Sequence, residues 1–130
     1  MKLIHLEFGR FELHDHYVVG EIFEGVHFDH DLNQIVKDLA MENYGPIKKV
    51  GYISVRRHNY SVDPLVHFEN KRFQILNSVA VVNVRENSRP THDIEACFYW
   101  KNRLKGFDDQ QVALNWTQRM LDQSQKTLLN

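Results

Sequence analysis

The sequence predicts a single α/β domain, residues 1–130, in which helices cover a mixed, largely parallel β-sheet that follows an amino-terminal β-hairpin. Apolar and polar residues alternate over 3–24, a β-branched and aromatic run occupies 50–55, and a second apolar run occupies 75–84. Between and after these runs, apolar residues recur at the spacing of a helix. Strands that alternate with helices after a hairpin imply parallel connections, so we expect one sheet and about four helices.

The first part of the chain contains the hairpin and the first helix. Gly9-Arg10 and Asp15-His16 interrupt the alternating pattern, and Asp15-His16 has the composition of a turn between two strands. The segment 28–31 then offers N-cap carboxylates to a helix. The apolar residues that recur at helical spacing are Leu32, Ile35, Val36 and Leu39. Gly45-Pro46 ends this helix, because glycine is favoured just beyond a helix C-terminus and proline cannot continue the helix.

The segment from Val50 to Pro64 is the predicted centre of the domain. Its first half reads as a buried strand, and Asp63 followed by Pro64 is a favourable start for a helix of about two turns over 65–71. In open α/β sheets, ligands and partners bind outside the carboxyl ends of the strands. We therefore expect the functional residues in the loop from Arg56 to Ser61.

The second half of the chain continues the alternation. The strand over 75–84 includes Val79-Ala80-Val81-Val82, which is too continuously apolar to have a wet face. A helix from Thr91, a short edge strand over 103–107 and a final helix capped by Asp108-Asp109 follow. The predicted buried stripe of the final helix consists of Ala113, Trp116 and Met120, with Leu114 and Leu121 beside them. The polar tail from Ser124 is predicted to fray.

Charge and composition exclude several classes of function. Sixteen basic and seventeen acidic residues give a net charge of −1, so no global field attracts nucleic acid or an anionic membrane. The single cysteine, Cys97, excludes an intramolecular disulfide and is expected to be a buried thiol, as in a reducing cytosol. The chain has no apolar run near the roughly 20 residues that span a bilayer, and the amino-terminal run is too short for a signal peptide. We expect a cytoplasmic protein.

The order of elements and three local segments resemble the SpoIIAA-like domains, relatives of the STAS domains of bacterial anti-sigma-factor antagonists. The segments are the hairpin end Tyr17–Ile22, the strand, loop and helix start Val50–Pro64, and the closing Leu104–Trp116 with its pattern F-D-D-x-x-x-A-L-x-W. The resemblance covers nearly the whole chain. It implies a non-enzymatic regulatory domain that binds a protein partner, in some members under control of serine phosphorylation. The Asp-Ser-Ser-Gly-like phosphorylation motif is absent, so Ser61 is a candidate phosphoacceptor by position alone.

Seven residues after the central strand are candidates for partner or anion binding: Arg56, Arg57, His58, Tyr60, Ser61, Asp63 and Phe68. The basic residues precede a helix whose free N–H groups favour an anion, although a solvated loop with scattered charges is the alternative. Tyr60 and Phe68 could together form a binding hot spot. The Ser61 hydroxyl could instead satisfy a turn, and Asp63 is assigned to the N-cap rather than to catalysis.

Neither a metal site nor an active site has a complete sequence signature. The chain contains eight histidines, but His14-x-His16, His27 and His30 lack a further ligand at a recognisable spacing. The sequence contains no G-x-S-x-G, no Walker loop and no dinucleotide fingerprint. We predict no metal, no cofactor and no enzymatic activity.

Two functions are consistent with the sequence. The first is binding of a protein partner through the loop after the central strand. The second is a carrier, of SpoIIAA-like or Sec14-like type, that holds an anionic or lipid-like small molecule between the 65–71 helix and the sheet. A large apolar cavity beneath that helix would favour the carrier, whereas a solid core with an exposed aromatic and basic patch would favour the protein partner. Homodimerisation through an edge strand or a helix is a further possibility.

Overall fold

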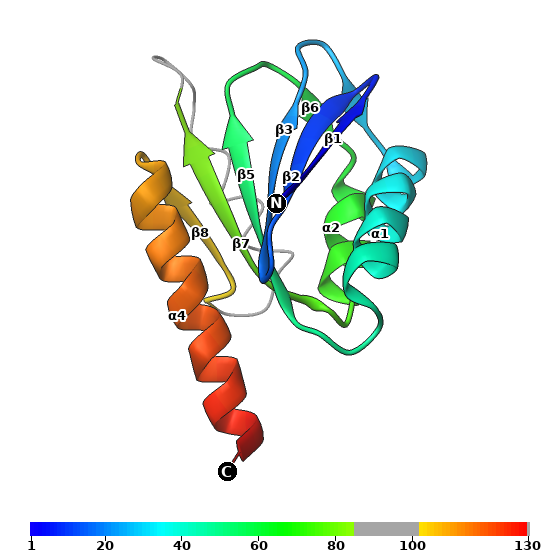
Figure 1. Ribbon diagram of the computed structural model, residues 1–130. Coiled ribbons are helices and arrows are strands. Elements are labelled where there is room, and N and C mark those ends of the chain that lie inside the picture. The colour runs from blue at the N-terminus through cyan, green and yellow to red at the C-terminus, as the bar shows by residue number, and fades with distance from the viewer. Residues whose placement is uncertain (85–101, 130) are drawn as a thin grey trace.

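The computed structural model describes residues 1–84 and 102–129 and confirms the predicted fold class, with a six-stranded mixed sheet between helices on its two faces (Figure 1). The strands of this sheet are β1 (Lys2–Leu6), β2 (Gly9–Leu13), β3 (Tyr17–Ile22), β5 (Val50–Arg56), β7 (Leu76–Asn83) and β8 (Leu104–Phe107). The described helices are α1 (His30–Tyr44), α2 (Pro64–Lys71) and α4 (Gln110–Leu129). The helix predicted from Thr91, with Cys97, lies outside the described residues.

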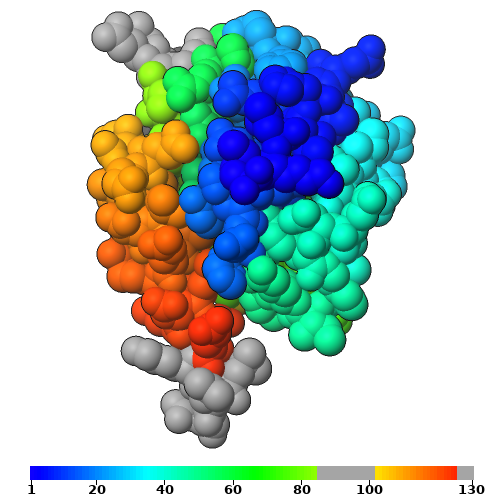
Figure 2. All heavy atoms as spheres, in the orientation of Figure 1, coloured from blue at the N-terminus to red at the C-terminus, as the bar shows by residue number. Residues whose placement is uncertain are grey.

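The strands are arranged in the order β1-β2-β3-β5-β7-β8. β1, β2 and β3 pair in antiparallel fashion, and β3, β5, β7 and β8 are parallel to one another. β5 therefore crosses the middle of the sheet, and β8 lies at an edge, as the sequence predicts. The outer amino-terminal strands form part of the molecular surface between α1 and α4 (Figure 2).

The predicted amino-terminal hairpin is wrong in its number of strands, because three antiparallel strands occupy this segment. The first turn joins Leu6 to Gly9, which are paired across β1 and β2. Gly9 is thus a strand residue rather than an interruption. A Cβ at this position would lie 2.8 Å from the Glu21 carbonyl oxygen, so the close approach of β3 explains the glycine.

A second, two-stranded sheet was not predicted. It pairs β4 (His27–Phe28) with β6 (Ser61–Val62) in parallel. These short strands immediately precede α1 and α2, respectively. Their pairing therefore places the amino termini of the two helices beside each other, at the edge of the main sheet where β3 and β5 end.

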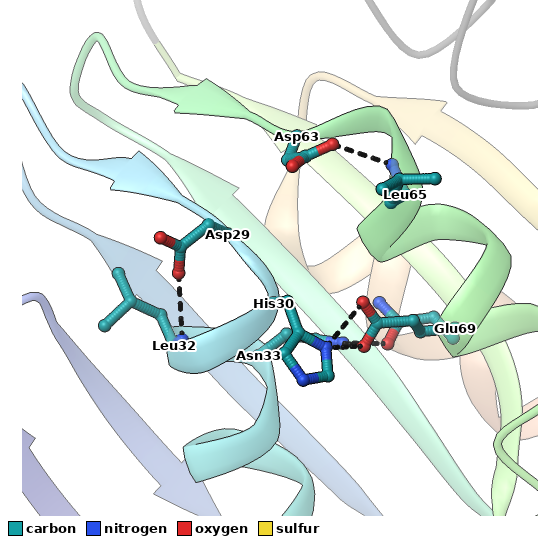
Figure 3. A network of polar contacts seen from close by, with 8 residues as sticks. Asp29, His30, Leu32, Asn33, Asp63, Leu65 and Glu69 are labelled. Carbon is teal, nitrogen blue, oxygen red and sulfur yellow. Dashed lines mark hydrogen bonds and ion pairs between the residues drawn. The ribbon is translucent and has the colours of Figure 1, made fainter.

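The predicted helix boundaries depend on local caps, and the structure contains these caps. Asp29 accepts a hydrogen bond from the Leu32 N–H at 3.1 Å, and Asp63 accepts one from the Leu65 N–H at 3.0 Å (Figure 3). Gly45 follows α1 with a φ of 81°, a value that favours glycine. α4 continues to Leu129 and so includes the polar segment that was predicted to fray.

α4 covers one face of the sheet at close range. A Cβ on Gly51 would lie 2.2 Å from the Thr117 Cγ2 atom, so the absence of a side chain on β5 permits the contact. Ala80, Ala113 and Thr117 are completely buried. Of the predicted stripe, Ala113 and Trp116 are buried and Met120 is only partly buried. Of the two residues predicted beside it, Leu121 is buried and Leu114 is partly buried.

α1 and α2 cover the opposite face, where the side chains are larger. The buried cluster on this face consists of Phe8, Phe11, Leu13, Val18, Ile22, Phe28 and Val66. Tyr52 projects over β3, and a Cβ on Gly20 would lie 2.1 Å from the Tyr52 hydroxyl oxygen. None of the helices within residues 1–84 and 102–129 is long and apolar enough to cross a membrane.

Candidate functional site: a cavity beneath α1 and α2

A cavity of about 110 Å³ lies between the sheet and the two helices α1 and α2. Most of its wall is apolar. Side chains from β2, β3, α1 and α2 contribute this part of the wall, among them Phe11, Leu13, Val18, Ile22, Val36 and Val66. Protein interiors contain few voids larger than a water molecule, so a cavity of this size in a small domain is a candidate ligand site.

Three polar side chains line the cavity near the carboxyl end of β5. The Ser54 hydroxyl oxygen lies 3.4 Å from the Tyr60 hydroxyl oxygen and 3.5 Å from the Arg56 Nε atom. The Arg56 guanidinium carbon lies 5.7 Å from the centre of the Tyr60 ring, within the range of a cation–π contact. Two predicted site residues, Arg56 and Tyr60, are therefore brought together on the cavity wall.

A second polar group joins α1 to α2 beside the cavity. The Asn33 amide donates hydrogen bonds to the Asn70 side-chain oxygen at 3.0 Å and to a Glu69 carboxylate oxygen at 3.4 Å. The His30 Nδ1 atom lies 2.9 Å from the same carboxylate (Figure 3). The hydrogen bond and negative charge of Glu69 raise the pKa of His30. These contacts hold α2 against α1.

The basic residues predicted to share an anion site are separated. Arg57 and His58 both contact Glu21, with the Arg57 Nε atom 3.2 Å and the His58 Nε2 atom 3.3 Å from its carboxylate oxygens. Arg56 instead lines the cavity. Arg56 is the last residue of β5 and shares the cavity face with Tyr52 and Ser54 through strand alternation, whereas Arg57 and His58 follow the end of the strand.

Ser61, Asp63 and Phe68 lie outside the polar group formed by Ser54, Arg56 and Tyr60. The Ser61 hydroxyl is 2.7 Å from the His27 Nδ1 atom within the β4–β6 pair, and Asp63 caps α2. Phe68 is 47% exposed, whereas Tyr60 is partly buried against the core. The predicted hot spot is thus divided between the outer surface of α2 and the cavity wall.

Three of the four histidines considered as metal ligands contact other side chains. His14 contacts Glu12, His27 contacts Ser61, and His30 contacts Glu69. Within residues 1–84 and 102–129, no group of three or more His, Cys, Asp or Glu side chains is arranged to hold a metal ion.

Several polar residues on the cavity wall were not predicted from the sequence, notably Asn33, Ser54 and His67, all of which are buried. Ser54 had a usable signal, since it is a polar residue within an apolar strand. Asn33 lies three and seven positions before Val36 and Ala40, so it shares their helix face. By contrast, Ile35 belongs to the predicted apolar spacing but is 43% exposed.

The sheet order and the helices on both faces define an α/β domain with a SpoIIAA-like fold, as the sequence resemblance predicts. A similar solved structure is that of an uncharacterized DUF3478-family protein from Shewanella loihica PV-4, which is described as having this fold. The TM-score is 0.52 at 12% sequence identity, and the match covers 89% of this chain and 90% of that chain. No protein-family model and no curated protein matches the sequence.

Proposed function

We propose that this chain is a non-enzymatic, cytoplasmic binding domain that holds a small, largely apolar molecule in the cavity beneath α1 and α2. The observation that carries this proposal is the cavity of about 110 Å³ with a mostly apolar wall. Of the two functions left open by the sequence, such a cavity favours the carrier. The domain would have a regulatory role if a ligand in the cavity changed the affinity of the domain for another protein.

Benzene is a suitable first probe, because an apolar cavity of about 150 Å³ in another protein binds it. We expect benzene to shift the methyl NMR resonances of cavity residues such as Val18 and Val66 in a saturable manner. We also expect it to raise the melting temperature, since a ligand that binds only the folded state stabilises that state.

A matched pair of variants tests whether the cavity is the site. Val66→Phe adds ring atoms from a fully buried position on the cavity wall, whereas Val112→Phe makes the same change on α4, where the side chain is 51% exposed. We expect benzene binding to be lost in Val66→Phe and kept in Val112→Phe, with both variants folded. Equal binding by the two variants would contradict the proposal.

A second candidate function is binding of a protein partner through the outer face of α2. Leu65 is 61% exposed and Phe68 is 47% exposed, and they lie three positions apart on the helix. The double variant Leu65→Ser, Phe68→Ser should lose a partner that co-purifies with the native protein, while Ile47→Ser, at a residue that is 85% exposed elsewhere, should retain it. Native mass spectrometry of the protein from its own source would report the partner, a small ligand, phosphate on Ser61 and any homodimer.

A further inference from the structure

The polar residues on the cavity wall indicate which class of small molecule fits the site, an inference that rests on the proposed function. Ser54 is buried, yet its hydroxyl oxygen is 3.4 Å from the Tyr60 hydroxyl oxygen and 3.5 Å from the Arg56 Nε atom. Usual separations are about 2.7–2.8 Å between hydroxyl oxygens and about 2.9–3.0 Å between a nitrogen donor and an oxygen. The three side chains therefore adjoin one another without forming short hydrogen bonds among themselves.

Each of these groups carries at least one hydrogen-bond donor, and the five N–H groups of a guanidinium allow Arg56 to donate to a ligand in addition to its contacts within the protein. A guanidinium only donates and carries a permanent positive charge, and each hydroxyl can donate one hydrogen. The best match is a negatively charged oxygen, because hydrogen bonds between charged partners are about twice as strong as those between neutral ones. The amino termini of α1 and α2 lie at the same edge of the sheet, and their dipoles also favour negative charge there.

We propose that the cavity binds a small monocarboxylic acid. The apolar body lies between the sheet and the two helices, and the carboxylate accepts hydrogen bonds from Ser54, Arg56 and Tyr60. The cavity volume of about 110 Å³ limits the buried part to roughly one ring or a short branched chain, since benzene occupies cavities of about 150 Å³.

The decisive comparison uses three probes with the same ring: benzoate, its neutral isostere benzamide, and toluene. NMR titration of the whole chain at pH 7 measures the dissociation constant of each. We expect benzoate to bind at least about tenfold more tightly than benzamide, on the strength of a charge-assisted hydrogen bond. Toluene has no polar group, so its dissociation constant measures binding to the apolar part of the cavity alone.

Variants then assign the preference to the residues. Arg56→Gln removes the charge, and Tyr60→Phe removes only a hydroxyl while keeping the ring. We expect each to weaken benzoate binding about tenfold more than it weakens toluene binding. Arg57→Gln is the matched control, because the neighbouring arginine contacts Glu21 and does not line the cavity. It should leave the binding of both probes unchanged.

The outcomes separate the two proposals. Toluene binding without a preference for benzoate over benzamide overturns the carboxylate site and leaves the apolar cavity in place. No binding of any probe overturns both. An equal loss of benzoate binding in Arg56→Gln and Arg57→Gln would indicate general charge attraction and would overturn the assignment. If the melting temperature of Arg56→Gln is lower than that of the wild type, benzoate binding by Tyr60→Phe decides whether the polar side chains bind the carboxylate.

Discussion

The two faces of the sheet are packed in different ways. On the α4 face, small residues meet at close range, with Gly51 against Thr117 and with Ala80 and Ala113 completely buried. On the face beneath α1 and α2, aromatic and polar side chains surround a cavity. Dense packing supplies stability and a cavity costs it, so the two faces are expected to contribute unequally to the stability of the fold.

The two faces also differ in how easily a crowded side chain can move to another position. Thr117 is a short, β-branched side chain with no exposed surface, so it has few alternative positions. Tyr52 is a long side chain that lies beside the cavity. The same substitution, glycine to alanine, should therefore have different consequences on the two faces.

The largest effect is expected for Gly51→Ala on the α4 face. The new Cβ would lie 2.2 Å from the Thr117 Cγ2 atom, so α4 or β5 must move. We expect the free energy of unfolding to fall by about 2–3 kcal/mol, measured by urea denaturation. Adding Thr117→Ser removes that methyl group and should recover more than half of the loss. No recovery in the double variant would show that the contact is not the cause.

Tyr44 is expected to have the next largest effect, because it attaches the end of α1 to the sheet. Its hydroxyl donates to the carbonyl oxygens of His14 and Tyr17 at 2.5 and 3.2 Å. Tyr44→Phe should lower the free energy of unfolding by about 1 kcal/mol at pH 7.

The contribution of the Tyr44 hydroxyl should also depend on pH. Burial raises the pKa of Tyr44 from 10.0 to about 12. Because the folded state has the higher pKa, the stabilisation is complete below pH 10 and is lost as the pH rises through about 12. The difference between wild type and Tyr44→Phe should shrink over this range. A constant difference from pH 9 to 12 would contradict the assignment.

Gly20→Ala on the cavity face should cost less than Gly51→Ala, although its Cβ would lie 2.1 Å from the Tyr52 hydroxyl oxygen. Tyr52 lines the cavity, so its ring can shift into open space. The lost chain entropy of the unfolded state offsets part of the strain, and we expect a net loss below about 1 kcal/mol. Benzene binding should weaken as the ring enters the cavity. A loss equal to that of Gly51→Ala would refute the contrast between the two faces.

The smallest effect concerns the contact between His30 and Glu69. Glu69 raises the pKa of His30 in the folded state, so this contribution to stability is present below the unfolded value of 6.5 and is lost as the pH rises through the folded value. NMR titration should show a lower pKa for His30 in Glu69→Gln than in wild type. Glu42→Gln, on an exposed position near the other end of α1, is the control and should leave the pKa of His30 unchanged.

Much of the fold could be predicted because its signals are local. Asp29 and Asp63 cap helices through N–H groups only two or three residues away. The continuous apolar run in β7 likewise indicates a strand with both faces covered. The third amino-terminal strand was missed because Gly9 reads as a break until the neighbouring Glu21 carbonyl is known.

The candidate site was predictable only in part. The loop after β5 was the expected region, and Arg56 and Tyr60 do line the cavity. Strand alternation puts Tyr52, Ser54 and Arg56 on one face of β5, but the alternation does not say whether that face is the one covered by α1 and α2. Asn33 is buried where it forms hydrogen bonds to Glu69 and Asn70. Because these partners are on another helix, far along the chain, the burial of Asn33 could not be predicted from its local sequence.

Caps, turns and apolar periodicity act over a few residues, and so the amino-acid sequence was sufficient for the order of the elements and for most helix ends. Tertiary contacts alone decided that the α4 face is closely packed and that the face beneath α1 and α2 contains a cavity. Their difference depends on how residues distant in the chain fit together, Gly51 with Thr117 on one side and Gly20 with Tyr52 on the other. Such complementarity of shape has no local pattern from which it could be predicted.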